Sequence, residues 1–137
     1  MSLETVKNFM KEVGWGLLAT SDGNKVGVRP MGSCVWMGNE LWAATTDGTE
    51  KIIQLRKVPY AEYCFSNSEG KHIRIAGLCT ISTDNDDKLK LYEAVPILKN
   101  YIKDPAEPTY VVIRMKPERI RLMAEAGKGY KDIEVPQ

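Results

Sequence analysis

The 137 residues are enough for one domain with its own core, and 43% hydrophobic with 27% charged residues is typical of a globular protein. The formal net charge of +1 gives no electrostatic reason to expect binding to nucleic acid or to an anionic membrane. No apolar run approaches the roughly 20 residues of a membrane span, and a signal-peptide pattern is absent. The three cysteines are odd in number and widely spaced, so we expect no disulfide framework, no metal site and a cytoplasmic location.

The first half of the chain predicts two helices and two β-hairpins. Apolar residues at three- and four-residue spacing predict a helix from Leu3 to about Val13, ending near Gly14. A second helix is expected from about Thr49 to Arg56, because Pro59 limits its end. The expected strands, separated by Gly-containing turns, are residues 16–20, 25–29, 35–37 and 41–45.

The second half predicts further strands around one helix. Asp84 is expected to cap a helix that Pro96 breaks or kinks. The expected strands are residues 61–65, 73–81, 110–115 and 119–123, the last two joined by a turn at residues 116–118. Residues 124–137 contain few apolar side chains, so we expect a loosely held tail unless a partner covers it. Hairpin spacing favours a single domain over residues 1–137, an antiparallel barrel or sandwich whose ends are closed by helices.

Two segments together predict a phosphate site. Arg29 lies in an expected strand that Pro30 makes an edge, a bulge or a bend, and a guanidinium beside such a strand can bind a phosphate. In the second segment a strand ends near Thr45, a turn follows, and a helix begins. The amide groups and the dipole of a helix N-terminus attract phosphate. Thr45 and Thr49 add hydroxyl groups, and Lys51 adds a cation.

These segments, in this order, resemble the pyridoxamine 5′-phosphate oxidase-like FMN-binding split barrels, particularly their small general-stress-protein type. The resemblance runs from about Leu3 to Met123. The segments that carry it are Gly16–Thr20, Val28–Met31, Leu41–Thr45, Gly48–Lys51, Val58–Ala61 and Ile73–Gly77. It implies a mainly β fold, an antiparallel split barrel with flanking helices, in a homodimer with FMN at the subunit interface. The residues it implies for FMN binding are Arg29, Pro30, Met31, Gly32, Ala44, Thr45, Thr46, Thr49 and Lys51.

The chain also departs from the full oxidases of this family. They carry a basic residue where this chain has Glu50, and a C-terminal segment rich in Arg and His, whereas this chain ends without histidine. Vitamin B6 oxidation is therefore not expected. Three functions remain open: an FMN-dependent oxidoreductase or flavin reductase acting on a small molecule or NAD(P)H, a non-enzymatic flavin-binding or stress-response protein, and a binder of haem or F420. No side chain is identified as a catalytic acid or base.

Overall fold

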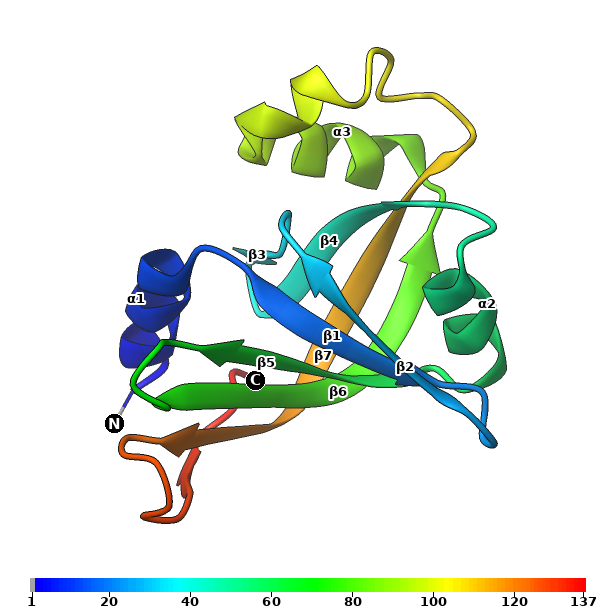
Figure 1. The fold of residues 1–137 in the computed structure, drawn as a ribbon. Helices are drawn as coiled ribbons and strands as arrows, with labels where there is room; N and C mark the ends of the chain where they lie inside the picture. Colours follow the sequence, from blue (N-terminus) through cyan, green and yellow to red (C-terminus); the bar gives the residue numbers. More distant parts are fainter. Residues whose placement is uncertain (1) are drawn as a thin grey trace.

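Every strand in residues 2–137, the part of the chain described by this computed structural model, joins one antiparallel sheet (Figure 1). The elements in chain order are α1 (Leu3–Val13), β1 (Gly16–Ser21), β2 (Val26–Met31), β3 (Val35–Met37), β4 (Glu40–Thr46), α2 (Glu50–Lys57), β5 (Tyr60–Ser66), β6 (His72–Ser82), α3 (Asn85–Ala94), the 3₁₀-helix η1 (Pro96–Asn100), β7 (Tyr110–Met123) and β8 (Lys131–Ile133). The expected helices and hairpins are present within a residue or two of their predicted bounds.

The strand order is β2-β1-β5-β6-β7-β4-β3, and β8 also pairs with β7. The sheet twists strongly along this path (Figure 1). Among the described residues no ladder joins β2 to β3, so the sheet stays open between its two ends. The predicted fold class, a mainly β antiparallel split barrel with flanking helices, is confirmed.

Two apolar clusters lie on opposite sides of this sheet. The larger cluster fills the inside of the curved sheet and includes Phe9 of α1, Leu18 of β1 and Ile75 of β6. The smaller cluster packs Leu91 of α3 and Leu98 of η1 against Trp42 of β4 and its neighbours on β7. The helical segment between β6 and β7 is therefore attached to β4 and β7 by its own apolar contacts.

The predicted turn at residues 116–118 is wrong, because β7 runs through it as one long strand. The register with β6 shifts there: Ala76 faces Arg119, whereas Gly77 faces Pro117, which leaves one extra residue in β7. Such a bulge admits a proline that cannot donate a ladder hydrogen bond. It also brings the backbones close together, since a Cβ on Gly77 would overlap the carbonyl oxygen of Lys116.

The segment after Ala124, expected to be loosely held, includes strand β8. Ile133 is buried in the main core, and the backbone of β8 pairs with β7. Just before β8, the Tyr130 hydroxyl lies 2.7 Å from Nε2 of His72. These contacts attach the tail to the sheet without a partner chain.

Candidate functional site

The β1–β2 hairpin holds the Arg29 guanidinium beside the start of α2. Its Nη1 donates to Thr20 Oγ1 at 2.6 Å and to the Leu18 carbonyl oxygen at 3.2 Å. Its Nη2 donates to Glu50 Oε1 at 3.0 Å. Only 18% of the Arg29 side chain is exposed, whereas 70% of the Glu50 side chain is. The position of Arg29 is therefore set by its own hairpin, and Glu50 adds a contact on the solvent side.

Sequence reasoning missed three residues that support Arg29. The Thr20 hydroxyl, which accepts from Arg29, donates to Oε1 of Gln54, and both of these side chains are buried. Gly27 leaves the space that Arg29 needs: a Cβ there would lie 2.5 Å from the Arg29 Nη2 and from the Glu50 Oε1. Gly27 lies two residues before Arg29, so strand alternation places it on the same face and could have indicated it. No sequence signal pointed to Gln54.

Lys51 places a second cation close to Arg29. Burial of the ammonium group lowers the pKa of Lys51, and the positive charge of Arg29 lowers it further. No ion pair of Lys51 occurs within residues 2–137. This group contains two cations, Arg29 and Lys51, and one carboxylate, Glu50, so its net charge is positive. An anion at this place would reduce the repulsion between the two cations.

The start of α2 is open to an acceptor. Thr49 is the N-cap residue, but its side chain makes no capping hydrogen bond. The Thr49 hydroxyl instead donates to the carbonyl oxygen of Thr46 at 2.9 Å. The first amide groups of α2 thus lack the side-chain acceptor that usually caps a helix, which is the arrangement that anions use at helix N-termini.

A cavity of about 510 Å³ adjoins this group, and Thr46 belongs to both. Its lining includes four of the predicted residues, Gly32, Ala44, Thr45 and Thr46. Sequence reasoning missed Ser33, which also lines the cavity: its hydroxyl accepts from the Ala44 amide at 3.0 Å and donates to the Ala44 carbonyl oxygen at 3.2 Å. These bonds tie the β2–β3 connection to β4 and fix that side of the cavity.

The predicted residues therefore form two adjoining groups, with two exceptions. Arg29, Thr49 and Lys51 gather at the start of α2, and the four cavity residues follow along β4 and the end of β2. Met31 is buried in the main core instead, and Pro30 is exposed. Neither lines the cavity.

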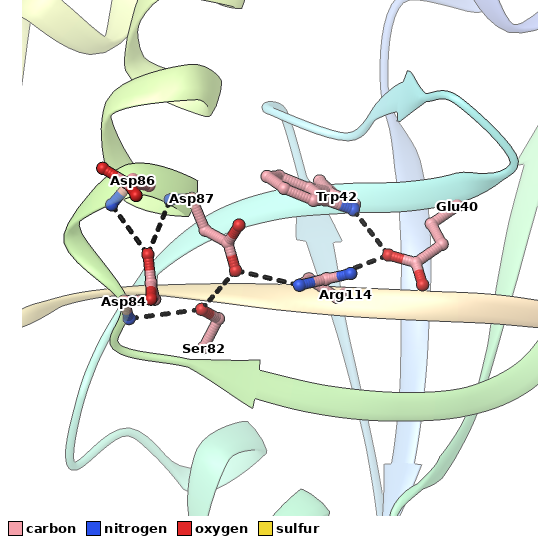
Figure 2. A network of polar contacts seen from close by, with 7 residues as sticks. All are labelled: Glu40, Trp42, Ser82, Asp84, Asp86, Asp87 and Arg114. Atoms are coloured by element: carbon pink, nitrogen blue, oxygen red, sulfur yellow. Dashed lines mark hydrogen bonds and ion pairs between the residues drawn. The ribbon is translucent and has the colours of Figure 1, made fainter.

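The other side of the cavity is formed by η1 and the segment that leads into β7. An ion-pair network holds the start of α3, the helix that precedes η1 (Figure 2). Arg114 of β7 donates to Glu40 Oε1 at 2.9 Å and to Asp87 Oδ2 at 2.9 Å. The Ser82 hydroxyl also donates to Asp87, at 2.7 Å. Asp84 caps α3 as predicted, accepting from the Asp86 amide at 2.8 Å. The start of α3 is thereby joined to three strands.

Burial raises the pKa of the Asp87 carboxyl, but the hydrogen bonds from Ser82 and Arg114 outweigh it, and the net pKa is lowered. The pKa of Glu40 is lowered in the same way, because Arg114 and Trp42 donate to it. Both carboxylates are therefore ionised at neutral pH and hold Arg114 between them. The aspartates at residues 84–87 belong to this structural network, and among the described residues no group of His, Cys, Asp and Glu could hold a metal ion.

A family model described as pyridoxamine 5′-phosphate oxidase matches residues 2–124. The chain belongs to this family. No curated protein sequence matches it. Within the part of the chain that is described, no helix is both long and apolar enough to span a bilayer.

Solved structures similar to this family member share its fold at low sequence identity. A NimC/NimA family protein from Clostridium acetobutylicum aligns with a TM-score of 0.80 at 23% identity, over 94% of this chain and 90% of that one. General stress protein 26 from Bacillus anthracis aligns with a TM-score of 0.72 at 21% identity, over 93% of this chain and 98% of that one. A pyridoxamine 5′-phosphate oxidase-related, FMN-binding protein from Nostoc punctiforme aligns with a TM-score of 0.68 at 16% identity, over 94% of this chain and 86% of that one.

Proposed function

We propose that this protein binds FMN and acts as an FMN-dependent oxidoreductase or flavin reductase. The observation that carries the proposal is the pair of cations, Arg29 and Lys51, at the open start of α2 next to the cavity. The phosphate of FMN would lie between these cations and accept from the first amide groups of α2. The isoalloxazine ring would lie in the cavity along Gly32, Ala44 and Thr45.

The residues present fit this cofactor in charge and in size. The donors at the start of α2 suit a phosphate, and the adjoining cavity has the volume of a small-molecule site. Family membership and the similarity to an FMN-binding protein support flavin as the ligand class. When bound, FMN would supply the redox chemistry, by accepting and donating a hydride. The protein's own contribution would be to hold the phosphate through Arg29 and to orient the ring against the backbone that Ser33 fixes.

The environment of His72 supports flavin over haem. His72 is the only histidine in the sequence. Its Nδ1 lies 3.0 Å from the Gly70 carbonyl oxygen and its Nε2 lies 2.7 Å from the Tyr130 hydroxyl. It does not line the cavity. A histidine whose ring nitrogens are both engaged elsewhere is a poor axial ligand for a haem in this site.

The outer face of the sheet supports a homodimer as part of this proposal. Val26 and Val28 of β2 are 80% and 60% exposed, and Tyr60 and Leu78, which face each other on β5 and β6, are 42% and 47% exposed. An apolar patch of this kind marks an interaction surface, and a second copy of the chain would cover it. Light scattering coupled to gel filtration tests this: a mass of twice 15.4 kDa is expected.

Cofactor binding is tested by comparing FMN with riboflavin, which lacks the phosphate. Arg29→Ala and Lys51→Ala should each weaken FMN binding by about 1.5–3 kcal/mol, the range for a charged hydrogen bond, and weaken riboflavin binding much less. Lys57→Ala, at the other end of α2, is the matched control and should change neither. Equal losses for the two flavins would show that the phosphate lies elsewhere.

The reaction is tested separately. Purified protein loaded with FMN is mixed with NADH or NADPH in a stopped-flow instrument, and flavin bleaching is followed. Rapid reduction supports a reductase. A flavin-loaded protein that resists both nicotinamides and common acceptors would favour a non-enzymatic flavin-binding or stress-response role, and a deazaflavin spectrum in purified protein would point to F420.

A further inference from the structure

The far side of the cavity has an apolar, exposed surface that the FMN assignment does not use. It is formed by η1 and the residues after it, with Ile97, Leu98, Tyr101 and Ile102 in the lining. Tyr101 is 78% exposed and Ile97 is 54% exposed. Apolar side chains that line a cavity and remain exposed favour the binding of a flat apolar molecule, which would remove them from water.

The charge of this side is opposite to that at the start of α2. The cavity lining contains one carboxylate, that of Glu107, and no Lys, Arg or His. Oε1 of Glu107 accepts from the Thr109 hydroxyl at 2.8 Å, and Thr109 also lines the cavity. A ligand that reaches this side meets a negative charge, whereas the phosphate end, with Arg29 and Lys51, is positive.

The backbone of Glu107 is held in place from behind. The Lys88 ammonium, which is 2% exposed, donates to the Glu107 carbonyl oxygen at 2.7 Å. The amide of Tyr110 donates to the same oxygen at 3.1 Å, and the Tyr110 hydroxyl donates to the Lys88 carbonyl oxygen at 2.7 Å. Lys88 does not line the cavity. Its bond to the backbone therefore positions Glu107 without supplying a cation to the ligand.

We propose that the space between the flavin and η1 receives a planar aromatic molecule that carries no negative charge, with Glu107 as the specificity-determining residue and Tyr101 as the stacking side chain. This rests on the proposed function for the position of the flavin. Glu107 accepts a hydrogen bond from an N–H group of the ligand and repels a carboxylate or phosphate at the same place. The two ends of the site therefore treat anions differently. The end with Arg29 and Lys51 binds the phosphate of the cofactor, whereas the end with Glu107 repels an anionic substrate.

The test uses benzimidazole, a planar neutral N–H donor at pH 7.5, and benzimidazole-5-carboxylate, its anionic analogue. Affinities are measured by ligand-observed NMR on the full chain, before and after FMN is added. Benzimidazole should bind the native protein about tenfold more tightly than the carboxylate. Glu107→Gln should improve binding of the carboxylate about fivefold, and Glu107→Lys should improve it further. Tyr101→Ala should weaken both probes about three- to tenfold, because the stacked ring is lost. Glu93→Gln, an exposed carboxylate on α3 outside the lining, is the matched control and should change nothing.

The outcomes separate the two proposals. If FMN fails to bind while the preference between the probes still depends on Glu107, only the proposed function is overturned. If FMN binds but Glu107→Gln leaves the two affinities unchanged, the assignment of Glu107 is overturned. Failure of both probes to bind, or affinities that do not respond to Tyr101→Ala, would overturn the placement of an aromatic ligand at η1.

Discussion

Replacing Glu50 with Gln should strengthen FMN binding. Glu50 is one of the two features by which the resemblance leads us to expect a difference from the full oxidases, and its Oε1 lies 3.0 Å from the Arg29 Nη2. A phosphate bound to the same guanidinium would lie close to the Glu50 carboxylate. Glu50→Gln removes the negative charge but keeps an oxygen that can accept from Arg29.

The size of the effect follows from Coulomb's law. For a phosphate of about two negative charges at about 6 Å from the carboxylate, a water-like effective dielectric gives about 1–2 kcal/mol of repulsion. The Glu50 side chain is 70% exposed, and physiological salt reduces the repulsion further. We expect about 1 kcal/mol in favour of binding, a roughly fivefold lower Kd. Arg29 keeps its bonds to Thr20 and to the Leu18 carbonyl oxygen, so its position should be preserved.

The assay is a titration of the apoprotein with FMN, followed by quenching of flavin fluorescence. Riboflavin is the ligand control and should bind the native protein and the Glu50→Gln variant equally. The gain for FMN should shrink at high salt, because the interaction is between exposed charges. Weaker FMN binding by the variant, or an equal gain for riboflavin, would refute the placement of the phosphate beside Arg29.

Three further predictions concern the fold and the assembly. Gly77→Ala should lower the free energy of unfolding by about 2–3 kcal/mol, measured by urea denaturation, since the added Cβ would overlap the Lys116 carbonyl oxygen; an unchanged midpoint would contradict the bulge. Arg114→Gln should make the free energy of unfolding less sensitive to acid. The pKa of Asp87 is lowered in the folded protein, so the ionised carboxylate stabilises the fold fully above the ordinary pKa of Asp, and this stabilisation is lost as pH falls through the lowered value. After allowance for screening, the free energy of unfolding of the native protein should fall by about 1 kcal/mol more than that of the variant between about pH 5 and 3. If the two proteins lost stability in parallel over this pH range, the result would argue against the network. Val28→Glu should shift a dimer to monomer in light scattering while circular dichroism shows that the chain stays folded, because Val28 is 60% exposed in the single chain; a persistent dimer would place the interface elsewhere.

Local patterns predicted most of the secondary structure. The helix periodicity from Leu3, the Gly-containing hairpin turns and the Asp84 cap depend on residues within a few positions of one another, so the sequence contains the signal. The wrongly predicted turn at residues 116–118 is also informative. Lys116-Pro117-Glu118 has the composition of a turn, but its conformation is decided by pairing with Gly77, about forty residues away.

In the candidate site, too, some features follow from the local sequence and others depend on tertiary contacts. The sequence by itself determined the family, the order of the strands along the chain and the residues near the start of α2, because adjacent residues carry helix, strand and turn signals. Only the tertiary structure decided what surrounds them. It brings Gln54 to Thr20 behind Arg29, Arg114 between Glu40 and Asp87, and Glu107 to the far side of the cavity. These contacts join segments that are distant in sequence, so they depend on how the sheet pairs and twists.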